Sequence, residues 1–320
     1  MEPLYELFRD TSVVKVFHAA RQDLEIFHVD AGVIPDPLFD TQVAAMVCGF
    51  GEQVGYETLV KRIAKQSVDK SSRFTDWSRR PLTEAQKHYA LADVTHLRVI
   101  YEYLAKKLAS SGRDKWVAEE LSVLTDPATY RTDPADAWQR VKTRNTSPKF
   151  LAILRELARF REEYAQSHDV PRSRVYKDDA LVELASTKPV TPQDLGRSRL
   201  LLREARKGDI ADGILAAVKA GLECPADRMP RAEALDDRAQ VNPALADLLR
   251  VLLKAKSESY GVAAKLIASA SDLDAIAAGA RDLPALRGWR LDVFGTDALR
   301  LCRGEVALAV KGSSVETVDL

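Results

Sequence analysis

The strand-forming residues of this chain are concentrated near its N-terminus, and the remaining sequence is patterned for helices. Residues 13–17, Val-Val-Lys-Val-Phe, form a β-branched run that is typical of a buried strand. Residues 38–41 follow a Pro-Asp-Pro break and are predicted to end a second strand. Residues 22–29 carry helical spacing of apolar side chains between the two. This order predicts an α/β segment at the start of the chain, followed by helical domains.

Two proline-containing stretches, residues 126–134 and 224–230, are interpreted as linkers. The expected domains are residues 1–125 (the α/β domain), 126–222 (first helical domain) and 231–315 (second helical domain). The helices expected in these domains cover 41–47, 56–63, 82–108, 150–164, 180–185, 210–220 and 245–260, with short ones beginning at Thr191, Ser271 and Gly288. Thr83 is a plausible N-cap for the third of these helices. The second and third domains share an order of helices, with residues 304–310 ending the chain's last unit, and are interpreted as a tandem repeat.

The composition is that of a globular protein, with 46% hydrophobic and 29% charged residues and a net charge of zero. Basic residues nevertheless gather in the middle of the chain, with nine against four acidic residues in 140–174 and five against one in 197–207. Such an excess indicates either a nucleic-acid-binding module or an ordinary solvated helix face.

Three isolated cysteines, an acidic N-terminus and the lack of a long apolar run predict a cytoplasmic protein without a membrane segment.

Two short segments carry residues suited to hydrolytic chemistry. The first is His18-Ala-Ala-Arg-Gln-Asp23, where a strand leads through small residues into a helix whose first turn holds Asp23. The second is Tyr89-Ala-Leu-Ala-Asp93, whose phenol and carboxylate share one helix face. A carboxylate can bind a divalent metal, and a phenol can position a water. Taken singly, Asp23 is better explained as an acid that stabilises a helix start, and the Tyr89–Asp93 pair as a packed ring with a surface carboxylate.

The order of these segments closely resembles the ribonuclease D family, 3′-5′ exoribonucleases with a ribonuclease-H-like fold. His18 to Asp23 is similar to the family's second exonuclease motif, and Tyr89 to Asp93 to its third motif in the tyrosine-containing form. Trp77, Arg79, Pro81 and Leu82 match the segment that leads into the third motif. The two helical units resemble HRDC domains, which are nucleic-acid-binding modules.

The resemblance implies that residues 1–125 are a partial, N-terminally truncated 3′-5′ exonuclease domain with an α/β ribonuclease-H-like fold. Two all-α HRDC-like domains would follow it. The resemblance also assigns roles to three residues. Asp23 and Asp93 would be metal ligands, and Tyr89 would help to orient the attacking water. Two divalent ions, Mg²⁺ or Mn²⁺, would be expected in a full-length member. The implied substrates are 3′ ends of tRNA precursors and other structured RNA, released as nucleoside 5′-monophosphates. The expected protein is a monomer without a nucleotide cofactor.

One departure from the family pattern concerns its first motif, an Asp-x-Glu on the first strand. Seventeen residues precede His18, and none belongs to an Asp-x-Glu. The chain therefore carries two of the family's four metal-binding acids. Two ions about 3.5–4 Å apart repel each other and need several carboxylates. We accordingly expect one weakly held ion at best, strongly impaired catalysis and an unpaired edge on the strand at residues 13–17. We also expect a translation start placed inside a longer gene, or a chain that was shortened deliberately. A degenerate homologue is the competing explanation, but the retention of Asp23, Tyr89 and Asp93 favours truncation.

Two other functions compete with the nuclease interpretation. A non-catalytic RNA-binding protein would use the HRDC-like modules, and its binding would depend on salt but not on a metal. A helicase is disfavoured because the chain has no G-x-x-x-x-G-K-[ST] loop.

Overall fold

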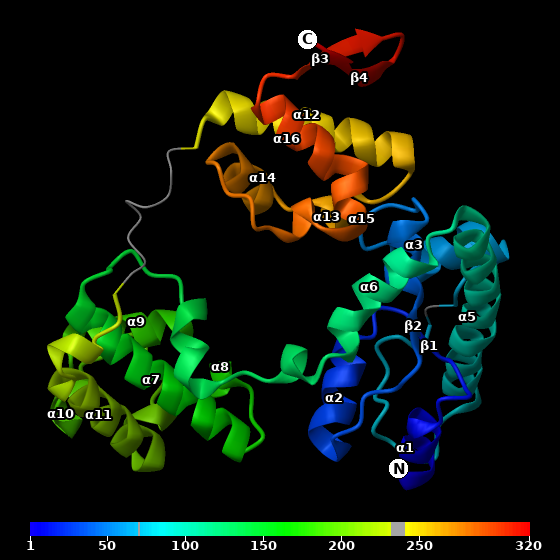
Figure 1. Ribbon diagram of the computed structural model, residues 1–320. Coiled ribbons are helices and arrows are strands. Elements are labelled where there is room, and N and C mark those ends of the chain that lie inside the picture. Colours follow the sequence, from blue (N-terminus) through cyan, green and yellow to red (C-terminus); the bar gives the residue numbers. More distant parts are fainter. Residues whose placement is uncertain (70, 232–240) are drawn as a thin grey trace. The chain divides into compact units, whose positions relative to one another are not determined.

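The computed structural model describes residues 1–69, 71–231 and 241–320, and these divide into two compact units (Figure 1). The first unit contains two stretches of chain, Met1–Tyr130 and Ala239–Leu320, and the second contains Arg131–Arg238. No described helix is long and apolar enough to cross a membrane. The three domain boundaries expected from the sequence remain predictions.

The first stretch of unit 1 is built around a small strand–helix–strand arrangement. Its elements are α1 (Glu2–Arg9), β1 (Lys15–Phe17), α2 (Arg21–Ala31), β2 (Leu38–Asp40), α3 (Thr41–Val47), α4 (Tyr56–Leu59), a π-helical turn (Val60–Ala64), α5 (Glu84–Ser111), α6 (Asp114–Thr125) and a 3₁₀ turn (Pro127–Tyr130). The expected α/β order is confirmed, since β1 and β2 pair in parallel and α2 connects them. Among the described residues β1 pairs with β2 alone, so no described strand pairs with its other edge.

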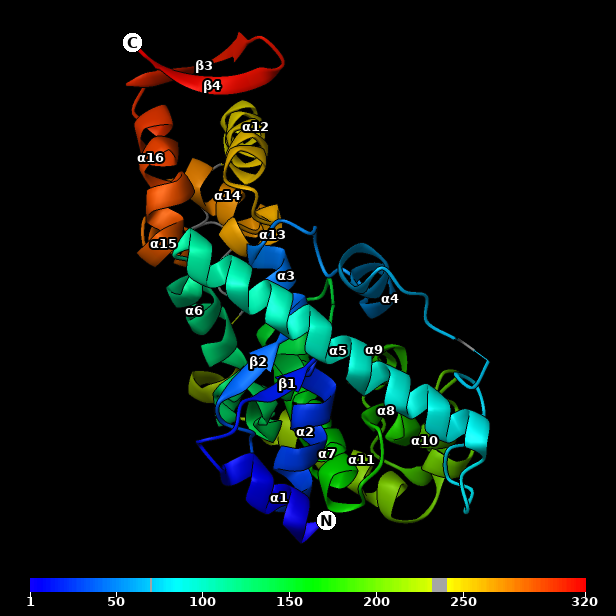
Figure 2. The same cartoon turned by 90° about the vertical axis from the view of Figure 1, so that its right-hand side faces the viewer.

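Helix α5 is the longest of the described helices, and it runs alongside the sheet and α3 (Figure 2). Its predicted N-cap is confirmed: the Thr83 hydroxyl accepts from the Gln86 backbone N–H at 3.2 Å, and the Gln86 side chain accepts from the Thr83 N–H at 2.9 Å. This reciprocal pair satisfies two backbone groups that a helix start leaves free. Gly112, at φ +67°, ends the helix in the left-handed conformation that glycine adopts without strain.

The second stretch of unit 1 is a helical layer with a β-hairpin at its end. Its elements are α12 (Pro243–Tyr260), α13 (Ala264–Ile267), α14 (Ala270–Ala277), a 3₁₀ turn (Pro284–Leu286), α15 (Gly288–Arg290), a π-helical turn (Leu291–Gly295), α16 (Thr296–Cys302), β3 (Val306–Lys311) and β4 (Ser314–Asp319). The expectation of an all-α unit was wrong for its last residues. Strands β3 and β4 pair antiparallel around a two-residue turn at Gly312, whose φ of +65° suits such a hairpin.

The start of α14 also differs from the expectation. Ser269, not Ser271, is the N-cap: its hydroxyl accepts from the Asp272 N–H at 3.1 Å, and the Asp272 carboxylate accepts from the Ser269 N–H at 2.8 Å. Both serines are followed three residues later by an aspartate, so two capping boxes overlap in the sequence. The helix that buries Leu273 and Ile276 begins at the earlier one.

The two stretches of unit 1 pack directly against each other. The indole of Trp116, from α6, stacks on that of Trp289 with 4.6 Å between ring centroids and 15° between planes. Arg290 lies over the Trp289 ring, forms ion pairs with Glu119 and Glu120, and donates from Nε to the Leu266 carbonyl at 2.7 Å. Residues far apart in sequence thus share one buried contact.

A second set of contacts joins the same two stretches through backbone groups. The Ala263 N–H donates to the Met46 carbonyl at 3.0 Å, and the Arg113 guanidinium donates to the carbonyls of Val47 and Tyr260. The first bond joins two main-chain groups, and the Arg113 side chain bridges two main-chain carbonyls, so together they hold the end of α12 against the end of α3.

Unit 2 is helical throughout its described elements. These are a 3₁₀ helix (Pro134–Arg140), α7 (Pro148–Ser167), α8 (Arg172–Val175), α9 (Asp178–Thr187), α10 (Pro192–Gly196), a 3₁₀ turn (Glu204–Arg206), α11 (Gly208–Glu223) and a 3₁₀ turn (Ala226–Arg228). The predicted N-cap Thr191 accepts from the Asp194 N–H at 3.2 Å. Helix α7 lies at the centre of the core, with Ile153, Leu154 and Leu157 fully buried.

Helices α7 and α11 approach each other closely because two glycines of α11 face α7. A Cβ atom built on Gly221 would lie 2.5 Å from the Ile153 Cα, and one on Gly213 would lie 2.0 Å from the Phe160 ring. The atom nearest to Gly221 belongs to the main chain of α7, which cannot move away, whereas the Phe160 ring that faces Gly213 can rotate. Gly221 therefore sets the distance between the two helices.

We expect Gly221→Ala to destabilise unit 2 by about 1–3 kcal/mol, since the overpacking outweighs alanine's advantage in a helix. Urea unfolding followed by circular dichroism measures the loss. Gly196→Ala is the matched control, because a Cβ there meets nothing within 4 Å. Equal stability of the two variants would contradict the close approach.

Candidate active site

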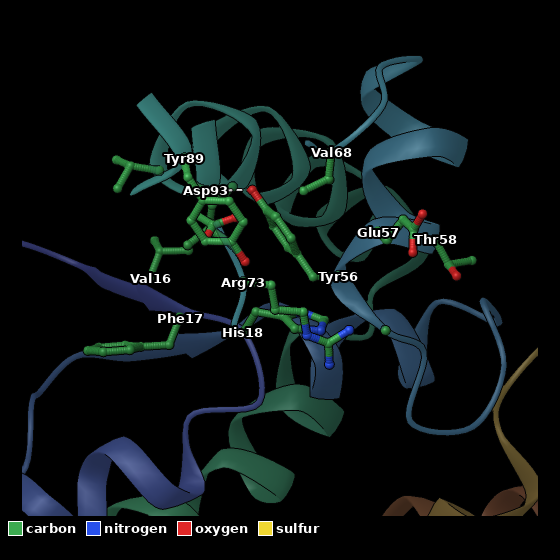
Figure 3. Close-up of a pocket in the computed structure, with 13 residues that line it drawn as sticks. Val16, Phe17, His18, Tyr56, Glu57, Thr58, Val68, Arg73, Tyr89 and Asp93 are labelled. Carbon is green, nitrogen blue, oxygen red and sulfur yellow. Dashed lines mark hydrogen bonds between the residues drawn. The ribbon is translucent and has the colours of Figure 1, made fainter. Parts of the chain in front are cut away.

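A cavity of about 570 Å³ lies in the first stretch of unit 1 (Figure 3). Its walls come from the end of β1, from α4, from the segment before α5 and from α5 itself. The lining residues are Val16, Phe17, His18, Gly55, Tyr56, Glu57, Thr58, Val68, Arg73, Tyr89, Asp93, Val94 and Leu97. Most of them are apolar or aromatic, and a few are polar or charged, as is typical of a small-molecule site.

The carboxyl ends of both parallel strands meet at this edge of the sheet. His18 follows β1, and Thr41 follows β2. His18 Nδ1 lies 3.0 Å from Thr41 Oγ1, and the Thr41 hydroxyl donates to the Phe17 carbonyl at 2.9 Å. Burial lowers the pKa of His18, against a smaller opposing effect of the Asp40 charge. The histidine ring is thus fixed and predominantly neutral near neutral pH.

Helix α5 brings the phenol and the carboxylate of the predicted third motif to the same wall. Tyr89 and Asp93 are one helical turn apart, and both line the cavity, as Figure 3 shows. Burial raises the pKa of Asp93, with a smaller lowering by His96. The Tyr56 hydroxyl donates to the Asp93 carbonyl, so α4 is tied to the turn of α5 that carries both residues. Trp77 packs near Tyr89, with ring centroids 5.8 Å apart.

Asp23 occupies a different position. It lies in the first turn of α2, as expected, but it is exposed and is not among the residues that line the cavity. Although the residue as a whole is exposed, partial desolvation of its carboxylate raises the pKa of Asp23; a backbone hydrogen bond lowers it, and the Asp40 charge adds to the rise. The structure therefore brings Tyr89 and Asp93 together with His18, and leaves Asp23 outside the cavity wall.

The sequence resemblance implies a centre of two metal ions, which side chains of the protein would have to hold. Within residues 1–69, 71–231 and 241–320, no three His, Cys, Asp or Glu side chains come close enough to hold a metal ion together. A centre of two ions needs several bridging carboxylates. The described side chains do not fit such a complete centre.

Sequence reasoning missed the part played by Asp40. Its carboxylate is 1% exposed and accepts from the backbone N–H groups of Ala19, Ala20 and Gln42 at 3.1, 2.7 and 2.7 Å. It thereby holds the turn after His18 and caps α3. An aspartate just before a helix is a known signal for a helix start. Its hydrogen bonds to the turn after β1, about 20 residues earlier in the chain, are not indicated by any local sequence pattern.

Tyr56 and Arg73 were also absent from the sequence-based site. Their segments carry no motif, and the fold alone places them on the cavity wall. Arg73 adds a positive charge to a site whose other charged residues, Asp93 and Glu57, are acidic.

Comparison with known proteins places the chain in a family. Residues 1–109 match the 3′-5′ exonuclease domain family, and residues 150–218 match the HRDC domain family. Ribonuclease D of Jannaschia sp. strain CCS1 is 65% identical over 320 residues, covering 100% of this chain and 83% of that protein. Ribonuclease D of Granulibacter bethesdensis is 48% identical, covering 99% of this chain and 81% of that protein.

A solved structure agrees with these matches. Escherichia coli RNase D, described as an exoribonuclease involved in structured RNA processing, matches with a TM-score of 0.80 and 28% identity, over 95% of this chain and 82% of that one. The expected ribonuclease-H-like exonuclease domain followed by a helical HRDC region is confirmed. The chain belongs to the ribonuclease D family of 3′-5′ exoribonucleases.

Proposed function

We propose that this chain binds the 3′ end of an RNA strand in the cavity and removes nucleoside 5′-monophosphates from it. The observation that carries the proposal is the placement of Tyr89 and Asp93 on one wall of a cavity that His18 and Arg73 also line. The E. coli relative acts in structured RNA processing, and we extend this substrate class to the present chain. Within it, tRNA precursors with short 3′ trailers are the proposed substrates.

The proposed roles follow from the chemistry of each group. Arg73 attracts the backbone phosphate, because a guanidinium pairs with phosphate oxygens. Tyr89 orients the water that attacks the phosphodiester, and Asp93 and Asp23 are the proposed ligands of a divalent ion, Mg²⁺ or Mn²⁺. When bound, such an ion would activate water and stabilise charge on the phosphate. With two carboxylates, we expect it to be held weakly and turnover to be slow.

The test is a nuclease assay on this chain, using RNA labelled at its 5′ end and carrying a single-stranded 3′ tail. We expect a slow ladder that shortens one nucleotide at a time and needs Mg²⁺ or Mn²⁺. Asp93→Asn should lower the rate about 100-fold or more, because it removes a ligand charge at the reacting centre. Binding of Mn²⁺, followed by electron paramagnetic resonance, should weaken in the same variant.

Asp212→Asn is the matched control, because Asp212 is an exposed aspartate of α11 in the other unit. It should leave both the ladder and Mn²⁺ binding unchanged. A ladder that survives Asp93→Asn, or that persists in a chelator, would show that the proposed centre is not responsible.

A second function, RNA binding without catalysis, is favoured by one observation: the described residues form no cluster of three metal ligands. The basic stretches of unit 2 would then hold the RNA backbone. Binding should weaken steeply with salt and persist in a chelator. Loss of binding in a chelator at constant ionic strength would count against this alternative.

We place the protein in the cytoplasm and treat it as a monomer within this proposal. The cysteines support a reducing compartment, since Cys48, Cys224 and Cys302 are all free.

A further inference from the structure

We propose that His18 presents an unprotonated Nε2 to the cavity and that this atom accepts a hydrogen bond from a ribose hydroxyl of the 3′-terminal nucleotide. The inference rests on the proposed function, because it assumes that a nucleotide occupies the cavity. It names the atom of the site that would recognise the sugar.

The protonation of the His18 ring follows from its neighbours. A carbonyl oxygen can only accept, so the Thr41 hydroxyl gives its single proton to the Phe17 carbonyl. The contact of 3.0 Å between Thr41 Oγ1 and His18 Nδ1 then requires Nδ1 to be the donor. In the neutral imidazole, the proton on Nδ1 leaves a lone pair on Nε2.

Two features keep the ring in this state and position. Burial disfavours the charged imidazolium and lowers the pKa of His18. The ring also packs against Tyr56, with centroids 5.6 Å apart, and Tyr56 is itself anchored to the Asp93 carbonyl. Figure 3 shows His18 and Tyr56 on the cavity together with Arg73. The acceptor is therefore preorganised.

The chemistry of a nucleotide selects the partner of this acceptor. Phosphate oxygens of the diester only accept, so they suit Arg73 and not an unprotonated nitrogen. Amino groups of the bases donate, but they differ among the four bases, and an enzyme that removes nucleotides in turn meets all of them. Ribose hydroxyls are donors that every terminal ribonucleotide carries. Where the contact is with the 2′-hydroxyl, it distinguishes RNA from DNA.

The cavity is large enough for this ligand. Its volume of about 570 Å³ lies within the range of sites that enclose small molecules. A mononucleotide is therefore a suitable probe, and its binding can be measured whether or not the chain turns over.

The experiment combines nitrogen-15 NMR of the His18 ring with titrations of three probes. We expect Nδ1 protonated and Nε2 unprotonated near neutral pH in the free protein. Adenosine 5′-monophosphate should bind about 3- to 10-fold more tightly than the analogue that lacks the contacted hydroxyl, the value of one hydrogen bond. The 2′-deoxy and 3′-deoxy analogues, titrated separately, show which hydroxyl it is.

Variants connect the effect to the ring. His18→Phe should lower the affinity for adenosine 5′-monophosphate to that of the deoxy analogue and abolish the discrimination. Thr41→Val, which has nearly the same shape, should release Nδ1 and reduce the discrimination while preserving the fold. His168→Gln, an exposed histidine of the other unit, should change nothing.

Two results would overturn the inference alone: a proton on Nε2 in the free protein, or equal affinities for all three probes. If none of the probes binds, the proposed function fails and the inference fails with it. These outcomes are distinguishable, because the first two leave nucleotide binding in the cavity intact.

Discussion

Replacing Asp40 with alanine should lower the free energy of unfolding of unit 1 by about 3–5 kcal/mol. Its buried carboxylate accepts from the N–H groups of Ala19, Ala20 and Gln42, and each buried donor left without a partner contributes about 1–3 kcal/mol of destabilisation. One of these donors, Ala20, is itself fully buried, so water cannot replace the lost acceptor there. Urea unfolding followed by circular dichroism measures the difference.

Asp76→Ala is the control for the Asp40 experiment. Asp76 also accepts from a backbone N–H, that of Ser78 at 3.0 Å, but in an exposed turn. Water can replace that acceptor, so the loss should stay below about 1 kcal/mol. The loss of stability in Asp40→Asn should lie between those of Asp40→Ala and Asp76→Ala. The amide oxygen can still accept a hydrogen bond, but the amide NH₂ would face the Ala20 N–H. A stability of Asp40→Ala within about 1 kcal/mol of the parent would refute this role.

Arg290→Ala is the second change with a large expected effect, again about 3–5 kcal/mol. The side chains of Arg290 and Glu120 are 14% and 12% exposed, and removal of one partner leaves the other charge buried without compensation. The variant also loses the packing of the guanidinium on Trp289 and its bond to the Leu266 carbonyl. Unfolding can be followed through the fluorescence of the stacked indoles of Trp116 and Trp289.

This loss should depend on pH. Burial raises the pKa of Glu120, and Arg290 opposes that rise. A carboxyl whose pKa is higher in the folded state stabilises the fold at low pH, and this stabilisation disappears as the pH rises through the folded-state value. Without Arg290 the pKa rises further. The deficit of Arg290→Ala should therefore be smaller near about pH 5 than near about pH 8.

A surface ion pair supplies the control for Arg290. Arg287 and Asp282 form one with side chains that are 68% and 84% exposed, and such pairs contribute about 0–1 kcal/mol. Arg287→Ala should consequently unfold near the parent's midpoint at either pH. A loss as large as that of Arg290→Ala would show that burial is not the cause.

Local patterns predicted the elements whose causes are local. The caps Thr83 and Thr191 and the periodicity of α7 and α12 each depend on neighbours within a few residues, and the structure confirms them. The β-branched run predicted a buried strand at residues 13–17, but β1 covers only Lys15–Phe17, and Val13 and Val14 are exposed. Where two local signals competed, at Ser269 and Ser271, the sequence interpretation chose the wrong one. The hairpin at the end of the chain was missed because Val306 and Val315 lie in segments that read equally as the end of a helical unit.

Only the part of the site that lies within a short sequence motif could be predicted from the sequence. Tyr89 and Asp93 are close in sequence, and a helix puts them on one face without help from the rest of the fold. The hydrogen bonds between His18 and Thr41 and between Asp40 and Ala20 join the ends of two strands. In each bond the two residues are too far apart in sequence for a local pattern to contain both. The same holds for Trp116 and Trp289, which only the folded chain brings together.

The stacked pair Trp116–Trp289 also has a consequence for the order of events during synthesis. The ribosome adds Trp289 some 170 residues after Trp116, which at about 5–20 residues per second corresponds to roughly 10–35 s. During that interval unit 2 can form its own core. The face of α6 that carries Trp116 stays exposed on the nascent chain until Trp289 is made. An aromatic surface of this kind is a natural target for chaperones, and a slow translation site between the codons of these two tryptophans would lengthen its exposure.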